Sequence, residues 1–263
     1  ELRKELGKTS TTKYNAVETC VCADGRVRGL LQFYGANRTG REAGRLVQVQ
    51  NLPHDVIPAA DAARELVKAQ NLDGLRLVYG SVTAALSALI RTVFVAAPGH
   101  AFVDADFSAI EARVVAWLAG ENWVLDVFRT HGKIYEATAA QMFGVPMEHI
   151  KKGRPEYAYR AKGKVATLAL GYQGGPGALV NMGALRSGLT EEELPDIVTR
   201  WRQSNPAIVR FWYQVEAAAL EAVQHGKTSI VGPVAIGREF DRDNGLDFMT
   251  VALPSGRKLY YVG

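Results

Sequence analysis

The sequence predicts an α+β protein, because helical and strand patterns occupy different parts of the chain. From about residue 122 to residue 225, apolar side chains recur at helical spacing almost throughout. Residues 229–263 change to short β-rich runs that are separated by turn signals. A chain of 263 residues with 48% hydrophobic residues can bury a sizeable core, in one or two domains.

The elements of the first half are expected to be short. Residues 1–35 mix short polar and apolar stretches, as at the end of a helical subdomain. Helices are expected at 61–70 and 81–91. An apolar run then predicts a buried strand at 101–106, and a helix at 108–119 follows at once.

The second half carries clearer signals for where elements begin and end. Pro155 suits the first turn of a helix that Gly174 and Gly175 end. Thr190 and Glu193 have the spacing of a capping box. The remaining signals are a helix from Asn205-Pro206 to about Gly226, and turns at Asp243-Asn244-Gly245 and Pro254-Ser255-Gly256.

Charge and cysteine content are those of an ordinary intracellular protein. The 31 basic and 27 acidic residues give a net charge of only +4, which indicates local basic patches instead of a global positive field. Cys20 and Cys22 are too close in sequence for an ordinary disulfide and have no second pair for a zinc site. We therefore expect a reducing compartment. No signal peptide or membrane-spanning run is present in the sequence.

An acidic motif follows the predicted strand at 101–106. Asp106 ends the strand, and a carboxylate held beside a helix N-terminus can present a divalent cation to phosphates. The simpler interpretation is that such an acid caps the helix. Glu111 has the S-x-x-E spacing of a capping box with Ser108, which explains it without a functional role. Asp104 is expected to be a solvated or hydrogen-bonded acid.

A basic ridge is predicted on the helix that begins near Pro155. Arg160, Lys164, Leu168 and Tyr172 are four residues apart, so they share one slowly drifting face. Two cations near the helix N-terminus suit phosphates, and the apolar and aromatic side chains that follow suit a sugar and a base. The alternative is an ordinary amphipathic helix whose Arg and Lys side chains are solvated.

The two motifs together resemble motifs A and B of the family A DNA polymerases. Thr39-Gly40-Arg41 and Gln50-Asn51-Leu52-Pro53 resemble the family's T-G-R…L-Q-N-I-P segment. Further matches are Ile90-Arg91, and Gly132-Lys-Ile-Tyr135 where the family often has D-I-H. Leu168 departs from the Phe or Tyr of many members. The residues of these segments resemble those of phage replicases more than those of bacterial repair enzymes.

The resemblance implies a role for each motif residue. Asp106 would ligate Mg²⁺, and the carbonyl of Phe107 would add an oxygen. Arg160 and Lys164 would bind the triphosphate, and Lys164 would also protonate the leaving pyrophosphate. Glu111 would exclude a 2′-hydroxyl. The other implied contacts are Leu168 and Tyr172 with the nucleotide and template base, and Arg41, Gln50, Asn51 and Arg91 with primer-template DNA.

The resemblance also implies how the chain is divided. A palm β-sheet would be interrupted by a mostly helical fingers subdomain, with a thumb remnant at the N-terminus. The expected segments are 1–100 for the thumb remnant and palm entry, 101–120 for the palm strand and helix with motif A, 121–228 for the fingers with motif B, and 229–263 for a partial palm.

Motif C, which supplies the second carboxylate of the two-metal site in this family, is not found in the sequence. We therefore expect an incomplete polymerase, whose motif C lies in another segment or a second polypeptide. The expected function is template-directed addition of dNTPs to a primer 3′-OH by two-metal phosphoryl transfer. It would serve phage DNA replication in the cytoplasm of a bacterial host.

Two alternatives remain at this point. The first is a non-catalytic module that binds primer-template and nucleotide, and that needs a second segment for activity. The second is a single-subunit RNA polymerase, which shares the palm layout. Glu111 argues against the second alternative, because a bulky acid at this position would clash with the 2′-hydroxyl of a ribonucleotide.

Overall fold

The structure is a computed structural model that describes residues 9–36, 40–54, 56–105 and 107–262. The chain divides into two compact units, Glu1–Asp104 and Ala105–Gly263. Each unit has its own hydrophobic core. The mixture of helices with small antiparallel sheets is consistent with the predicted α+β class. None of the helices in the described part of the chain is both long enough and apolar enough to cross a lipid bilayer.

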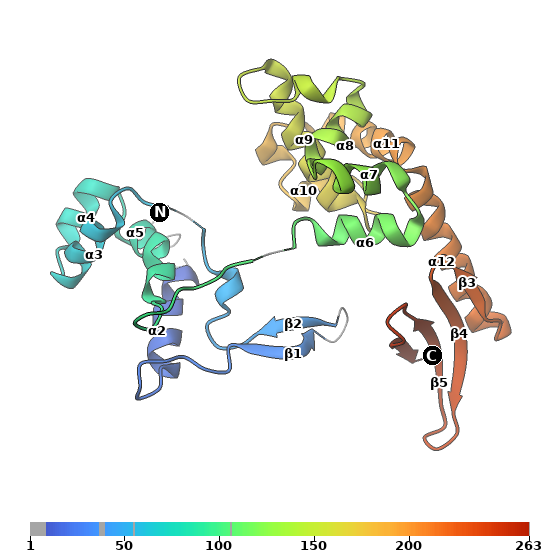
Figure 1. Ribbon diagram of the computed structural model, residues 1–263, viewed down its shortest axis with the longest axis horizontal. Helices are drawn as coiled ribbons and strands as arrows, with labels where there is room; N and C mark the ends of the chain where they lie inside the picture. The colour runs from blue at the N-terminus through green and yellow to red at the C-terminus, as the bar shows by residue number, and fades with distance from the viewer. Residues whose placement is uncertain (1–8, 37–39, 55, 106, 263) are drawn as a thin grey trace. The chain divides into compact units, whose positions relative to one another are not determined.

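The first unit combines short helices with one small hairpin (Figure 1). Strands β1 and β2 pair antiparallel, with Leu31 opposite Gly44. The elements in chain order are α2 (Thr9–Cys20), β1 (Leu31–Ala36), β2 (Arg41–Gly44), η1 (Val49–Asn51), α3 (Ala60–Lys68), α4 (Leu72–Tyr79), α5 (Val82–Leu89) and η2 (Ile90–Val93), where η denotes a 3₁₀ helix.

The core of the first unit joins segments that are distant in sequence. Val47, Leu52 and Ile90 are buried together, and side chains of α2 pack against them. The hydroxyl of Tyr14 donates a hydrogen bond of 2.7 Å to the carbonyl of Leu86, which ties α2 to α5. Burial raises the pKa of Tyr14 to about 12, because the phenolate is disfavoured away from water.

The predicted helices of the first unit are confirmed, with two differences. The helix expected at 61–70 is α3, whereas the helix expected at 81–91 is divided into α5 and the 3₁₀ turn η2. Helix α4 was not predicted. Its signals are nevertheless local, because the side chain of Asn71 accepts a hydrogen bond from the N–H of Gly74, and Gly80 ends the helix with φ 76°.

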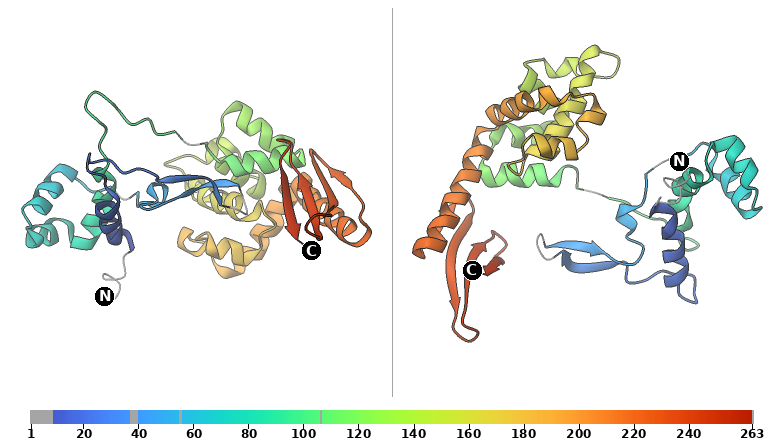
Figure 2. Two further views of the ribbon diagram at one scale, coloured as in Figure 1. Left: turned by 90° about the horizontal axis from the view of Figure 1, so that it is seen from below. Right: turned by 180° about the vertical axis from the view of Figure 1, so that it is seen from behind.

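The second unit consists of a helical bundle followed by a four-stranded sheet (Figure 2). A core of buried side chains from α8 to α12, centred on Leu170, Leu179, Ile197 and Trp201, holds the bundle together. The helices are α6 (Ile110–Ala119), α7 (Asn122–Thr130), α8 (Ile134–Phe143), η3 (Met147–His149), η4 (Pro155–Tyr157), α9 (Ala158–Leu170), α10 (Pro176–Asn181), η5 (Leu185–Ser187), η6 (Glu191–Glu193), α11 (Leu194–Ser204) and α12 (Pro206–His225).

Helix α12 links the bundle to the sheet. Figure 1 shows the C-terminal half of α12 beside the strands of the sheet. This half buries Ala218 and Ala222 in one core with Val231 and Ile236 of the sheet. The sheet is antiparallel in the order β3 (Ser229–Val231), β4 (Val234–Asp241), β5 (Leu246–Ala252) and β6 (Lys258–Val262). The predicted capping box at Thr190 is confirmed, as are the long helix from Pro206 and the turns before β5 and β6.

The strand predicted at 101–106 is wrong for the described residues. Residues 101–105 form no strand, and the side chains of Phe102 and Val103 are 69% and 93% exposed. A strand is stabilised by hydrogen bonds to a neighbouring strand. None of the strands in the described ranges pairs with this segment, so its apolar pattern alone does not make a strand. Asp106 lies outside the described residues.

The helix that follows begins later than the sequence predicts. Helix α6 begins at Ile110, and Ala109 occupies the N-cap position with φ 50°. Because the chain turns at Ala109, Ser108 lies one residue too early to cap the helix. The predicted Ser108–Glu111 capping box is therefore wrong, and no side chain caps the helix through the N-cap residue. The carbonyl of Ser108 instead accepts a hydrogen bond of 2.9 Å from Nε of Arg113.

Candidate functional site

The predicted basic ridge lies on helix α9. Arg160, Lys164 and Leu168 occupy successive turns of this helix, and Tyr172 follows in the turn after it. The opposite face of α9 buries Val165, Ala166, Ala169 and Leu170 in the core of the bundle. This burial fixes the rotation of the helix, so the ridge residues remain at or near the surface.

Arg160 is held by a carboxylate of the neighbouring helix. Its Nε donates a hydrogen bond of 2.7 Å to Oε1 of Glu136 on α8, and the guanidinium lies 5.6 Å from the ring centre of Tyr135. The Glu136 side chain is only 17% exposed and that of Arg160 is 34% exposed. The hydrogen bond to Glu136 raises the pKa of Arg160 above its ordinary value, so the guanidinium stays charged.

Lys164 has a different environment from Arg160. Its side chain is exposed and makes no ion pair with another residue in the described ranges. It lies one helical turn beyond Arg160, and Lys162 between them is turned toward Glu193 with an Nζ to Oε1 distance of 2.8 Å. Arg160 and Lys164 are therefore the two cations of α9 that an anionic ligand on the ridge would meet first.

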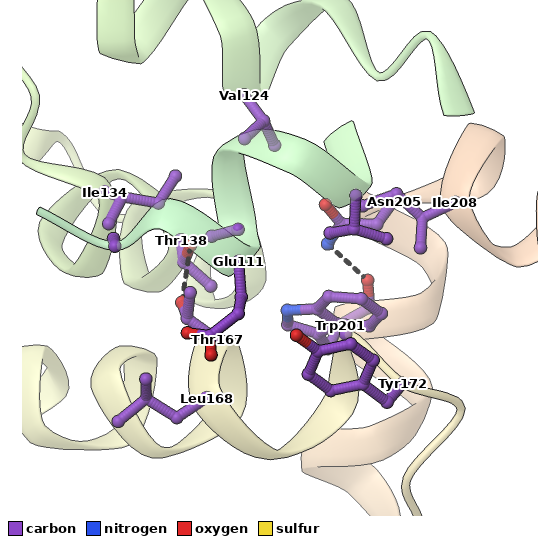
Figure 3. A pocket seen from close by; sticks show the side chains of 14 residues that line it. Glu111, Val124, Ile134, Thr138, Thr167, Leu168, Tyr172, Trp201, Asn205 and Ile208 are labelled. Atoms are coloured by element: carbon purple, nitrogen blue, oxygen red, sulfur yellow. Dashed lines mark hydrogen bonds between the residues drawn. The ribbon is translucent and has the colours of Figure 1, made fainter. Parts of the chain in front are cut away.

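Leu168 and Tyr172 border a small cavity beside the ridge (Figure 3). Its volume is about 50 Å³, which holds a few water molecules but not a nucleoside. Glu111 reaches from α6 toward α9 and lines the same cavity, near Thr167 and Leu168. Outside the cavity, the ring of Tyr172 is 68% exposed at the end of the ridge.

The turn that carries Tyr172 is held by side chains of two other helices. Nε1 of Trp212 on α12 donates a hydrogen bond of 3.1 Å to the carbonyl of Gly171. Arg202 on α11 donates one of 3.3 Å to the carbonyl of Gly174. Trp212 also stacks on Trp201, with ring centres 5.9 Å apart. The exposed ring of Tyr172 thus projects from a turn whose backbone is fixed on both sides.

The predicted metal ligands are only partly described. Asp106 lies outside the described residues, and Phe107, whose carbonyl was expected to bind Mg²⁺, is 78% exposed. No three His, Cys, Asp or Glu side chains of the described ranges are grouped to hold a metal ion. The predicted donors, a carboxylate and a carbonyl oxygen, are the hard ligands that Mg²⁺ prefers.

The predicted DNA-contacting residues all belong to the first unit. Arg41 begins β2, and Gln50 and Asn51 form the end of η1 with both side chains exposed. Arg91 has a different environment. Its Nε and Nη2 donate hydrogen bonds of 2.7 and 2.8 Å to the carbonyls of Pro53 and Leu52. These hydrogen bonds hold the backbone of Leu52 and Pro53, which follow Gln50 and Asn51 directly in the chain. Thr39 lies outside the described residues.

Several side chains that shape the site were not predicted. Glu136, Arg202 and Trp212 hold Arg160 or the turn of Tyr172, and they lie 24 to 41 residues away from their partners in the sequence. Sequence spacing indicates neighbours within one helix and says little about contacts between helices. In the sequence, the position of Glu136 directly after Tyr135 of the D-I-H-like string is the feature that could have drawn attention to it.

Comparisons with known proteins agree with the motifs. Residues 3–232 match the family model for DNA polymerase family A. The chain is 58% identical over 262 residues to a DNA polymerase of Bacillus phage SP02, which covers 99% of the chain and 39% of the phage protein. It is 31% identical over 132 residues to DNA polymerase I of Pseudomonas aeruginosa, covering 50% of the chain and 14% of that protein. A DNA polymerase of Mycobacterium phage D29 is 29% identical over 153 residues, which cover 58% of the chain and 23% of that protein.

Proposed function

Because the chain belongs to DNA polymerase family A, we propose that it carries the nucleotide-binding part of a template-directed DNA polymerase of phage type. The chain spans 39% of the length of the phage SP02 polymerase, so the activity of the whole enzyme is part of this proposal. Helices α7 to α12 would form the fingers, the sheet β3–β6 part of the palm, and residues 1–100 the thumb remnant and palm entry.

The observation that carries this proposal is the exposed face of α9. It offers a guanidinium at Arg160, an ammonium at Lys164, an apolar side chain at Leu168 and a ring at Tyr172, in that order. A nucleoside triphosphate has the same order of chemistry, from phosphates to sugar to base. Phosphate oxygens accept charge-assisted hydrogen bonds from Arg and Lys, which are stronger than neutral ones.

Three further residues complete the proposed nucleotide site. Glu111 borders the same cavity as Leu168 and Tyr172, where it would crowd the sugar 2′ position. Asp106 and the carbonyl of Phe107 would hold Mg²⁺. When bound, Mg²⁺ would supply charge neutralisation at the phosphates and activation of the primer hydroxyl. Lys164 would also donate a proton to the leaving pyrophosphate.

The first unit would hold the primer-template. The exposed side chains of Gln50 and Asn51 offer amide donors, which can test the geometry of a base pair through acceptors that are nearly the same for every pair in the minor groove. Arg41 would add a contact near the primer end. Arg91, whose donors bind the carbonyls of Leu52 and Pro53, would contribute mainly by holding this segment in place.

Primer extension with separate measurement of DNA affinity tests the proposal. Arg160→Ala and Lys164→Ala should each weaken dNTP use by about 1.5–3 kcal/mol, because each removes a charge-assisted phosphate contact. Primer-template affinity should change little, and Asp106→Asn should abolish incorporation. Arg186→Ala is the control, since Arg186 is an exposed arginine on η5 and is not one of the ridge residues of α9.

Three other outcomes would change the proposal. Equal losses in dNTP use and DNA affinity would place α9 on the duplex instead of at the nucleotide. Binding of dNTP and primer-template without any extension would favour the alternative of a binding module that needs a second segment for catalysis. Near-normal turnover of Asp106→Asn with Mg²⁺ would remove the motif A assignment.

A further inference from the structure

Glu136 is an acidic residue of the second unit that contacts the basic ridge of α9 directly, through Arg160. It is largely buried on the first turn of α8, and its Oε1 accepts a hydrogen bond of 2.7 Å from Nε of Arg160. In the described part of the chain, Arg160 makes no other hydrogen bond. The carboxylate therefore occupies one donor of the guanidinium and leaves the two terminal nitrogens available.

We propose that Glu136 is a positioning residue for the triphosphate, which orients the guanidinium of Arg160 so that both terminal nitrogens face the phosphates. The inference rests on the proposed function, since it needs Arg160 to be a phosphate ligand. A guanidinium binds phosphate best through two parallel N–H donors, and this requires the plane of the group to be fixed. An acceptor at Nε fixes this plane without using the terminal donors.

The scaffold behind Glu136 is rigid enough for this role. Helices α8 and α9 approach so closely that a Cβ at Gly163 would come within 2.2 Å of the carbonyl oxygen of Tyr135. A hydrogen bond of 3.1 Å between the hydroxyls of Thr167 and Thr138 joins the same two helices (Figure 3). A carboxylate on such a scaffold orders the arginine before the ligand arrives, which lowers the entropy lost on binding.

The direction in which triphosphate affinity changes when Glu136 is removed separates positioning of Arg160 from simple charge repulsion. A buried carboxylate near a triphosphate repels it, so removal of Glu136 should tighten binding if the side chain does nothing else. If Glu136 positions Arg160, its removal should weaken binding, although a negative charge has been lost. The two hypotheses therefore predict changes in opposite directions for the same substitution.

The experiment measures the dissociation constants of dATP and of inorganic tripolyphosphate, both with Mg²⁺, for the chain by titration calorimetry. Glu136→Ala should raise both constants by about five- to tenfold. Glu136→Gln keeps an acceptor for Nε and removes the repulsion, so it should bind at least as well as the wild type. Binding by Glu136→Ala that equals or exceeds the wild type would overturn the inference.

Three further variants test whether the change in binding comes from misfolding and whether it acts through Arg160. Glu136→Asp keeps the charge but withdraws the carboxylate by one methylene, so it should weaken binding even if Glu136→Ala is unstable. Glu193→Gln alters the comparable ion pair with Lys162, which is 2.8 Å long, and should leave binding unchanged. In an Arg160→Lys background, Glu136→Ala should have almost no additional effect, because the guanidinium that it orients is absent.

Failure of the inference differs visibly from failure of the proposed function. If the wild-type chain binds neither dATP nor tripolyphosphate, the α9 ridge is not a triphosphate site and both proposals fall. If the wild type binds, Arg160→Ala weakens binding and Glu136→Asp does not, the nucleotide site stands and Glu136 is only a partner in an ion pair. A fall in melting temperature without a change in either dissociation constant would likewise leave Glu136 with a structural role alone.

Discussion

At the scale of single residues, Glu111 illustrates how the structure separates two interpretations of one motif. The S-x-x-E spacing with Ser108 suggested a capping box, but the turn at Ala109 removes Ser108 from the cap position. The carboxylate instead reaches the cavity bordered by Leu168 and Tyr172. A capping box with Ser108 therefore does not explain Glu111, and its role in selecting the sugar is a prediction that kinetics can test.

Replacement of Glu111 by alanine should raise ribonucleotide incorporation relative to deoxyribonucleotide incorporation by roughly tenfold or more, because the side chain would no longer clash with a 2′-hydroxyl. The ratio of the two kcat/KM values measures this directly. Glu148→Ala is a suitable control, since Glu148 is an exposed acid on η3. An unchanged ratio would leave Glu111 without a role in sugar selection and would reopen the RNA polymerase alternative.

Residues of the site that share one helix were predictable, and their partners on other helices were not. Arg160, Lys164 and Leu168 lie on one face because the helical period is a local property. Glu136, which holds Arg160, comes from another helix and is found only through the packing of α8 on α9. The roles of Asp106, Lys164 and the DNA-contacting residues remain predictions.

At the scale of elements, the start of α12 depends on a residue that precedes it by more than 80 positions. Pro206 opens the helix and has no N–H, so Ala207 and Ile208 carry the first free N–H groups. Both donate to Oε2 of the buried Glu121, at 2.8 and 3.2 Å. The side chain of Asn205, which the sequence suggested as the opening residue, instead donates to the carbonyl of Trp201.

The variant Glu121→Ala should lower the free energy of unfolding of the second unit by about 1.5–3 kcal/mol, because two buried N–H groups lose a charged acceptor. Glu121→Gln should lose less, since its amide oxygen still accepts. Urea unfolding followed by tryptophan fluorescence reports on this unit alone, because all four tryptophans lie at positions 117, 123, 201 and 212. A loss no larger than that of the exposed Glu191→Ala would contradict the capping role.

Elements were predicted well where their signals are local and poorly where they depend on distant partners. The capping box at Thr190, the proline at 206 and the turn at Gly245 each act within a few residues, and all three are confirmed. The strand at 101–106 depends on a neighbouring strand to pair with, which no local pattern can supply. Helix α4 has the local signals of Asn71 and Gly80, but its 8 residues span too few turns for a clear apolar period.

At the scale of the whole chain, the boundary between the two units coincides with the segment where the predicted strand is absent. The division falls between Asp104 and Ala105, and residues 101–105 are exposed without regular secondary structure. Each unit has its own buried core, so neither needs this segment for its packing. An exposed and unpaired stretch between two cored units is the kind of site at which proteases cut first.

Limited proteolysis with chymotrypsin should therefore cut first after Phe102 or Phe107 and release two fragments that resist further digestion. Phe33 and Phe240 are about as exposed, at 80% and 62%, but they lie in the paired strands β1 and β4, whose backbones cannot enter a protease cleft without local unfolding. Mass spectrometry of the first fragments identifies the cut. A Phe102→Ala, Phe107→Ala double variant should delay it strongly. First cuts at Phe33 or Phe240, or protection of the 101–107 segment, would instead indicate that this segment is paired as a strand, as its apolar pattern had suggested.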